Sequence, residues 1–343
     1  MVNLVSSSPN NNAGQHWGWH GLWVPDDEPH LNRQSRLQVL NRRDRQYGLR
    51  WVWASNGQVP ANAVRTTGPS GSRTYIGRAH FQGSVTPGMI VPERKACCIS
   101  WGGNEHSIKI YEVLCSAGSF VQITQTDADA LLRATTGGIS ESGEPIFIGR
   151  AKHKGNWIAG KVQRSHGSLG MCYIPYGGKE VACPEYQVFI AVPPEPGTIG
   201  HYWRSTEEFN IPPDATIGGA NENGPLYIGH ASHRGSCTPG QISRATNRCH
   251  IAWGGSEHRK PAFEFLCNCR GKFVASQDGQ VPVGAVLGGW SEYEGEPLFI
   301  GRVQVNGHWL VGKVQPSHKV CYIPSNGKEV AHKHYEIFVH DGI

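Results

Sequence analysis

The chain has 343 residues, of which 44 are glycine and 22 are proline, and it carries a net charge of +5. So much glycine and proline favours short strands and turns and disfavours long helices. The thinly spread charge excludes an electrostatic argument for nucleic-acid binding, and no apolar stretch approaches the length of a membrane span.

The first 48 residues lie outside the pattern that governs the rest of the chain. We interpret residues 1–48 as an N-terminal extension that docks its tryptophans on the next domain and leaves its arginines in water. The alternative is contact with a partner or an anionic surface. No secretory signal is visible, so we expect a cytoplasmic protein, with unconventional secretion or surface association left open. The residues concerned are Trp17, Trp19, Trp23, Arg33, Arg36, Arg42, Arg43 and Arg45.

From residue 49 onward, one unit of about seventy residues occurs four times. Its most constant phrase appears as Tyr75-Ile-Gly-Arg78, Phe147-Ile-Gly-Arg150, Tyr227-Ile-Gly-His230 and Phe299-Ile-Gly-Arg302. The four glycines are 72, 80 and 72 residues apart, and the longer middle interval contains a proline-rich stretch. We therefore place a linker at residues 192–200, between a first domain (49–191) and a second domain (201–343).

Each unit presents the same elements in the same order. An aromatic residue opens it, the Ile-Gly-Arg strand follows, a cysteine-bearing strand runs into a glycine turn, and a closing strand ends the unit. Apolar and polar residues alternate in the closing strands, which is typical of a sheet with one buried face. The sequence therefore predicts an all-β protein of two tandem antiparallel domains, each with internal pseudo-symmetry. The opening aromatic residues are Trp51, Phe120, Trp203 and Phe273.

The ten cysteines are predicted to be free thiols, because a chain of this size without a signal does not need disulfides. Cys267 and Cys269 form a Cys-x-Cys pair, and His230 and His233 are close to Cys237, but neither group matches a zinc-site spacing. We predict neither a metal ion nor a cofactor.

Two glycine-rich segments, 155–161 and 307–313, resemble phosphate-binding loops. Each is followed by valine, Val162 or Val314, where that motif needs a serine or threonine for magnesium. No hydrolase, metalloprotease or dinucleotide motif is present, and Glu144 and Glu296 sit beside prolines where a structural turn role suffices. We therefore expect a protein that is not an enzyme.

Several longer phrases recur in fixed order along the chain. They are Gly143-Glu-Pro-Ile-Phe-Ile-Gly-Arg150, Gly160-Lys161, Cys172 to Glu180, and their counterparts Gly295 to Arg302, Gly312-Lys313 and Cys321 to Glu329. These phrases resemble the DM-nine repeat proteins, which include mannose-binding lectins of bivalves. The resemblance covers about residues 49–339 and extends to all four units.

The resemblance implies domains of two intertwined repeats, with sugar bound without calcium by a lysine and an acidic side chain. The lysine position holds Met89, Lys161, Gln241 and Lys313 in the four units. Alignment on the prolines of the Gly-Glu-Pro phrases puts Ser140 and Glu292 in the acidic position, with Glu141 one residue along.

We therefore expect one competent site in each domain, in the second and fourth units. A lysine ammonium and a carboxylate together can bracket the hydroxyls of a hexose. Trp157 and Trp309, four residues before the lysines, either offer a flat face to the sugar ring or pack in the core.

The leading hypothesis is a calcium-independent lectin for mannose-type glycans or polysaccharide, with a pattern-recognition role in innate defence. The alternative is a protein-interaction or membrane-associated scaffold whose sugar sites have partly decayed. The oligomeric state stays open.

Overall fold

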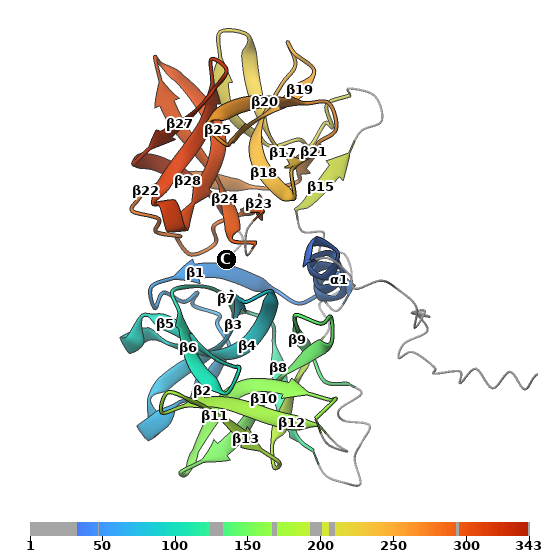
Figure 1. The fold of residues 1–343 in the computed structure, drawn as a ribbon, viewed down its shortest axis with the longest axis vertical. Coiled ribbons are helices and arrows are strands. Elements are labelled where there is room, and N and C mark those ends of the chain that lie inside the picture. The colour runs from blue at the N-terminus through green and yellow to red at the C-terminus, as the bar shows by residue number, and fades with distance from the viewer. Residues whose placement is uncertain are drawn as a thin grey trace, which may run out of the picture.

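The computed structural model describes residues 33–46, 48–123, 133–166, 170–192, 201–205, 210–292 and 295–341. The tryptophans of the N-terminal extension and residues 193–200 of the predicted linker lie outside these ranges. Figure 1 shows two β domains, one running from blue to green and the other from yellow to red, with a single helix beside their junction.

The first domain is a 14-stranded antiparallel sheet. Its strands are β1 (Trp51–Ser55), β2 (Arg65–Thr67), β3 (Arg73–Phe81), β4 (Ser84–Val91), β5 (Ala96–Trp101), β6 (Asn104–Ile108), β7 (Ile110–Leu114), β8 (Gly118–Gln122), β9 (Thr136–Ile139), β10 (Pro145–His153), β11 (Asn156–Gln163), β12 (Met171–Tyr176), β13 (Lys179–Cys183) and β14 (Gln187–Ala191). Two short 3₁₀ helices, η2 (Pro69–Gly71) and η3 (Pro92–Arg94), lie in its connections.

The second domain is also a 14-stranded antiparallel sheet. Its strands are β15 (Tyr202–Ser205), β16 (Ile217–Asn221), β17 (Gly224–His233), β18 (Ser236–Ser243), β19 (Arg248–Trp253), β20 (Ser256–Lys260), β21 (Glu264–Cys267), β22 (Gly271–Gln277), β23 (Leu287–Trp290), β24 (Pro297–Val305), β25 (His308–Gln315), β26 (Val320–Ser325), β27 (Lys328–His332) and β28 (His334–His340). A 3₁₀ helix, η4 (Pro316–His318), follows β25.

Both sheets close on themselves through strands that the two repeats exchange. In the first domain β9 pairs with β10 of its own repeat and with β4 of the other repeat. Strands β4, β5, β6, β13, β12, β11, β10 and β9 therefore form a ring, and β18, β19, β20, β27, β26, β25, β24 and β23 form the matching ring in the second domain. The prediction of two tandem antiparallel β domains, each of two intertwined repeats, is confirmed.

The glycine that follows proline, alanine or valine in each unit is required by close strand packing. A Cβ atom on Gly160 of β11 would lie 2.1 Å from the carbonyl oxygen of Tyr173 on β12. On Gly312 of β25 it would lie 2.0 Å from the carbonyl oxygen of Tyr322. Because no side chain fits there, only glycine lets these neighbouring strands approach.

The aromatic residue that opens each unit stacks on the cationic residue of the Ile-Gly-Arg phrase. The Arg78 guanidinium lies 4.1 Å from the ring centre of Trp51, and the Arg302 guanidinium lies 3.9 Å from that of Phe273. Phe120 holds Arg150 at 4.1 Å in the same way, and in the third unit Trp203 stacks on the His230 ring. The repeat signature therefore encodes a partly buried contact between an aromatic ring and a cationic or imidazole side chain.

A reciprocal pair of glutamates locks the repeats of each domain together. In the first domain Glu180 accepts a hydrogen bond from the Gly103 N–H at 2.6 Å, and Glu105 accepts one from the Gly178 N–H at 2.8 Å. The second domain repeats the arrangement with Glu329 on Gly255 and Glu257 on Gly327. A carboxylate of one repeat thus satisfies the glycine turn of the other.

The N-terminal extension contains a helix, α1 (Arg33–Gln46), which the sequence analysis did not predict. Leu37 and Leu40 are buried and pack with Val85, Ile139 and the half-buried Trp290 of the second domain. Three and four residues separate Leu37, Leu40 and the buried Asp44, which is the spacing of one helix face. The helix docks through leucines, and the basic run lies along it.

The two domains are joined by direct packing in addition to the chain connection. The Ser55 hydroxyl of β1 donates to the Val281 carbonyl at 2.9 Å, and the Gly284 N–H donates to the Trp53 carbonyl at 2.9 Å. Trp53 also belongs to a buried apolar cluster of the second domain that includes Phe299. The Pro/Ala/Val turn of the fourth unit, residues 281–286, is therefore seated on the first domain.

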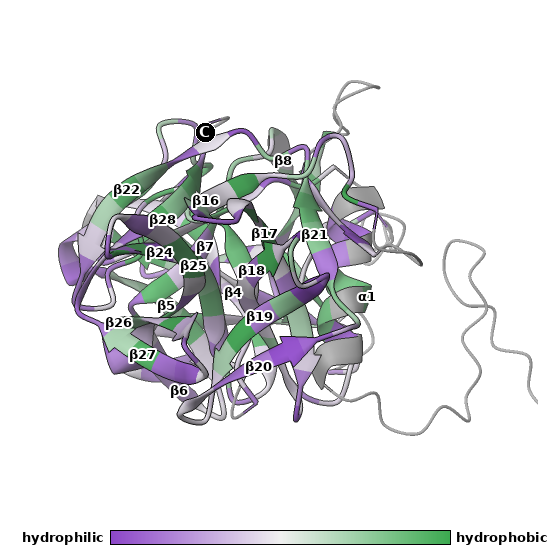
Figure 2. Cartoon of the chain, turned by 90° about the horizontal axis from the view of Figure 1, so that it is seen from above, coloured by the Kyte–Doolittle hydropathy of each residue, from purple (hydrophilic) through white to green (hydrophobic). Residues whose placement is uncertain are grey.

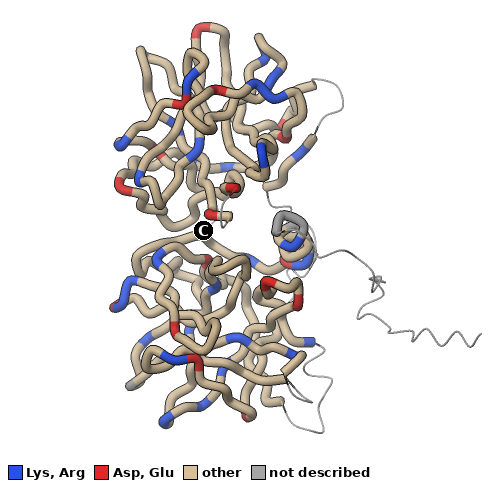
Figure 3. Tube along the Cα trace, viewed as in Figure 1, with Lys and Arg blue, Asp and Glu red and all other residues tan. Residues whose placement is uncertain are grey.

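Hydropathy and charge follow this architecture. Figure 2 shows hydrophobic colour along inner strands such as β17 and β18 and hydrophilic colour along β20. Figure 3 shows basic and acidic residues interspersed over both domains, as expected from the small net charge. All ten cysteines are free thiols. Among the described residues no helix is long and apolar enough to span a membrane.

Candidate functional site

The two predicted lysines occupy equivalent positions and make equivalent ion pairs. Lys161 on β11 lies 3.0 Å from Glu180 Oε1 on β13, and Lys313 on β25 lies 3.0 Å from Glu329 Oε1 on β27. Both lysine side chains are only 7% exposed. The lysines are therefore fixed in place before any ligand arrives, because each ammonium already has a carboxylate partner.

Glu180 and Glu329 are the site residues that sequence reasoning missed. Each uses its other carboxylate oxygen to accept from a glycine turn, Gly103 or Gly255, of the partner repeat. The signal was present in the sequence, because both lysine-bearing units have a Gly-Lys-Glu phrase after the cysteine-bearing strand.

The predicted acidic residues lie in the loops after β9 and β23. Ser140 is buried, and its hydroxyl accepts from the Glu144 N–H at 2.9 Å. The Ser291 hydroxyl accepts from the Glu296 N–H at 3.0 Å in the same way. Ser140 therefore corresponds to Ser291, which corrects the predicted pairing of Ser140 with Glu292.

The corrected pairing makes Glu141 and Glu292 true equivalents. Both side chains are exposed, and their Cβ atoms lie 3.8 Å from where a Cβ would stand on Gly83 and Gly235 respectively. Alignment on the prolines gave the wrong pairing because the loop from Ser291 to Glu296 is one residue longer than the loop from Ser140 to Glu144. The second unit therefore has its acid, Glu141, at the position that Glu292 occupies in the fourth unit.

Glu292 and Lys313, both among the described residues, are not ion-paired, and the direct partner of Lys313 is Glu329. The loop carries Glu292 on its exposed side, while the lysine lies deeper on β25.

Glu292 and Lys313 nevertheless line one cavity of about 870 Å³. Glu296, Tyr322 and Glu329 also line it. Residues of the second domain that also line it are Thr238, Trp253, Gly254, Ser291, Gly295, Pro297, Leu298, Gln315, Ser317 and His318. Residues of the first domain complete the wall: Trp53, His80, Phe81, Gln82, Ile108 and Ile110. The site of the fourth unit is therefore shared between domains.

A tyrosine lies under each lysine. The Lys313 ammonium is 5.2 Å from the ring centre of Tyr322, and that of Lys161 is 5.5 Å from the ring centre of Tyr173. Burial, and then the neighbouring Glu329, raise the pKa of Tyr322 above its usual value, and Glu180 has the same effect on Tyr173. Both phenols therefore stay neutral at physiological pH and keep an O–H for hydrogen bonding.

The first and third units fill the lysine position with side chains used for packing. Met89 is 1% exposed and belongs to a core cluster, and the Gln241 side-chain oxygen accepts from the Val311 N–H at 3.0 Å. The glutamates there contact other side chains: Glu105 pairs with the Arg94 guanidinium, and Glu257 contacts the His250 imidazole.

Trp157 and Trp309 hold arginines of the repeat signature. Arg150 lies 4.8 Å from the ring centre of Trp157, and Arg302 lies 4.1 Å from that of Trp309. Both tryptophans are half-buried. Among the described residues, those that line the cavity do not include Trp309. These contacts favour a packing role for the two tryptophans over a role as a flat surface for a sugar ring.

Glu144 and Glu296 have the structural role expected of them. Glu144 accepts from the N–H and the hydroxyl of Ser165, and Glu296 accepts from the N–H and the hydroxyl of Ser317. These bonds tie the Gly-Glu-Pro loop to the end of the lysine-bearing strand.

No curated protein matches the chain. The crystal structure of the nematode sperm cell motility protein MFP2B is similar at 15% sequence identity, over 86% of this chain and 98% of that chain, with a TM-score of 0.33. A likeness this distant supports no conclusion about function. The DM9 repeat model matches residues 68–183, 167–259 and 225–332, which include the lysines, the glutamates and both acidic loops. The chain therefore belongs to the DM9 repeat family.

Proposed function

We propose that this protein is a calcium-independent lectin for mannose-type glycans and that it binds sugar without turning it over. The observation that carries the proposal is the cavity in which Lys313, its partner Glu329 and the loop acid Glu292 all present polar groups. A pattern-recognition role in innate defence follows from this proposal.

The chemistry of the cavity suits a hexose. The Lys313 ammonium has three N–H donors and directs one toward Glu329, which leaves donors for sugar hydroxyls. Glu292 is exposed and accepts hydrogen bonds, and charge-assisted bonds of this kind compete best with water. Trp53, Phe81 and Trp253 add apolar surface against which the C–H face of a sugar ring packs.

The first domain carries the same polar groups in a different setting. Lys161, Glu180, Tyr173 and Glu141 match the fourth-unit residues one by one, but helix α1 lies beside the loop of Glu141. Side-chain atoms of Arg36 lie 3.8 Å from where Cβ atoms would stand on Gly83 and Gly143. Two sites with different walls are therefore expected to differ in affinity for the same glycan.

Retention on mannan resin in the presence of a chelator tests the proposal. The variant Lys161→Met/Lys313→Met removes both ammonium groups and introduces the residue that the first unit carries naturally at Met89. We expect this double variant to elute with the void volume. Glu141→Gln/Glu292→Gln changes only exposed side chains and is expected to weaken retention more than about tenfold, because two charged acceptors become neutral.

Glu185→Gln is the matched control, since Glu185 is an exposed acid remote in sequence from both loops. It should bind like the unchanged protein. Circular dichroism and a thermal melt establish that each variant is folded. Full retention of a folded lysine double variant contradicts the proposed site, and dependence of wild-type retention on calcium contradicts the metal-free mode.

A further inference from the structure

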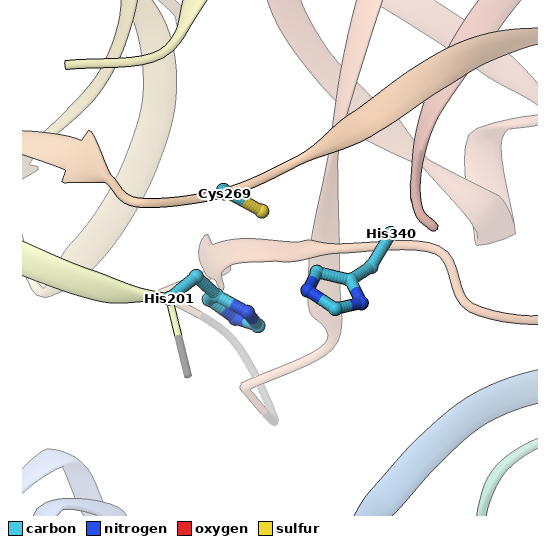
Figure 4. A group of neighbouring side chains, drawn as sticks. All are labelled: His201, Cys269 and His340. Atoms are coloured by element: carbon cyan, nitrogen blue, oxygen red, sulfur yellow. The ribbon is translucent and has the colours of Figure 1, made fainter. Parts of the chain in front are cut away.

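Three metal-ligating side chains converge at one end of the second domain. His201 precedes β15, Cys269 lies in the turn between β21 and β22, and His340 is the last residue of β28. One ligand atom of each lies within 4.8 Å of the others. Figure 4 shows the Cys269 sulfur directed toward the side on which the two imidazole rings lie.

The backbone holds two of these residues in place. The His340 N–H donates to the Gly284 carbonyl at 3.0 Å, and the next N–H, of Asp341, donates to the Arg270 carbonyl at 3.0 Å. In the turn that presents Cys269, the Asn268 N–H donates to the Asp214 carbonyl at 3.0 Å. Cys269 is 8% exposed, His340 is half-buried and His201 is exposed. His201 is thus the ligand with most freedom to adjust.

The spacing fits a tetrahedral ion after a small closure. Zn–S and Zn–N bonds of about 2.3 and 2.0 Å place tetrahedral ligand atoms about 3.3–3.6 Å apart. Each pair of atoms must therefore approach by at most about 1.5 Å, which rotations of the three side chains can supply. A thiolate with two imidazoles is a donor set that suits Zn²⁺ and disfavours Ca²⁺ and Mg²⁺.

The repeat fold does not require these residues. Strand register places Leu49 where the second domain has His201, because Trp51 pairs with Leu114 as Trp203 pairs with Leu266. It also places Ala191 where the second domain has His340. Ala191 pairs with Gly118, the first residue of β8, and His340 pairs with Gly271, the first residue of β22. The matching turn of the first domain, residues 115–118, is one residue shorter. The same fold thus forms without any of the three ligands.

We propose that His201, Cys269 and His340 form a binding site for a zinc-class divalent ion. Cys269 and Asp341 also line a cavity of about 570 Å³, which gives an ion a route from solvent. Water from this cavity completes four-coordination. The bound ion joins the first residue of the described second domain to its last strand.

Titration of the chelator-treated full-length protein tests this site. Isothermal titration with Zn²⁺ is expected to give one ion per chain, and Co²⁺ is expected to give the near-ultraviolet charge-transfer band of a cobalt–thiolate bond. His201→Ala is the principal variant, because an exposed side chain is removed without disturbing the core. We expect it to weaken Zn²⁺ binding at least about tenfold, and Cys269→Ser to abolish the cobalt–thiolate band.

Two matched controls keep the outcome specific. His334→Ala removes an exposed histidine from the same strand β28, and Cys115→Ser removes a partly buried thiol from the matching turn of the first domain, after β7. Both should bind Zn²⁺ as the unchanged protein does. The proposal is overturned if the wild-type chain binds no Zn²⁺ at micromolar concentration, or if folded His201→Ala and Cys269→Ser bind it unchanged.

Discussion

The Glu329 carboxylate accepts a hydrogen bond of 2.6 Å from the backbone N–H of Gly255, a residue of the other repeat in its domain. Its second oxygen lies 3.0 Å from the Lys313 ammonium. One side chain therefore locks the two repeats together and holds the lysine of the candidate sugar site. Stability and the proposed sugar binding are therefore coupled at this residue.

Glu329→Gln is expected to cost about 3 kcal/mol of unfolding free energy, because the nearly buried Lys313 ammonium loses its charged partner. Urea denaturation at neutral pH measures the change. Glu336→Gln is the control, since the Arg302–Glu336 pair is about a quarter exposed and should cost only about 1 kcal/mol. Equal losses in the two variants would contradict the structural role of Glu329.

Glu112 gives the protein a pH-dependent contribution to stability. Burial alone would raise the pKa of Glu112, but Arg78 and His80 outweigh it and lower the pKa to about 2. Since the folded pKa lies below the ordinary value of 4.5, the stabilisation is complete above about pH 4.5 and is lost as the pH falls toward 2. The stability gap between the unchanged protein and Glu112→Gln should be about 3 kcal/mol at pH 7 and shrink at pH 3. Denaturant titrations at both pH values measure this stability gap. A gap of the same size at both pH values would contradict the prediction.

Leu40→Ala should destabilise the docking of helix α1. Leu40 is 2% exposed and packs with Val85, Ile139 and Trp290, so truncation leaves a cavity worth about 3 kcal/mol. Hydrogen exchange of the helix amides measures the local loss. Val39→Ala, on a half-buried face of the same helix, should change exchange little. Protection that survives Leu40→Ala would mean that the leucines do not hold the helix.

Trp309→Ala separates packing from sugar binding. The ring covers the Arg302 guanidinium at 4.1 Å, so its removal should cost at least about 1 kcal/mol of stability. Because Trp309 is not among the described residues that line the cavity, retention on mannan should persist in the folded variant. Loss of retention without loss of stability would assign the ring to the sugar site.

The fold could be predicted from the sequence because its determinants recur four times. The glycines, opening aromatics and Ile-Gly-Arg phrases each report a local packing requirement, such as the missing space for a Cβ on Gly160. Helix α1 occurs once, and its leucines are few among many arginines. Neither repetition nor composition therefore revealed it.

The candidate site was only partly accessible to sequence reasoning. Lys161 and Lys313 were named because the repeat aligns their position, but their partners lie two strands away, on β13 and β27, and only the folded sheet shows that the side chains meet. The loop acids were misaligned by one residue because the two loops differ in length. Trp53 and Phe81 line the fourth-unit cavity from another domain, and no local spacing encodes that contact.

The seating of turn 281–286 on strand β1 has a consequence for multivalent ligands. Ser55 and Trp53 anchor this turn by hydrogen bonds. The two lysine-bearing sheets are therefore held together and do not move independently, as domains on a flexible linker would. Under the proposed function, a branched or polymeric glycan would meet its two binding sites at a fixed separation. The gain in avidity would then depend on whether the repeat length of the glycan matches that separation. Two sites at a fixed distance select ligands by spacing, whereas a flexible linker between the domains would tolerate many spacings.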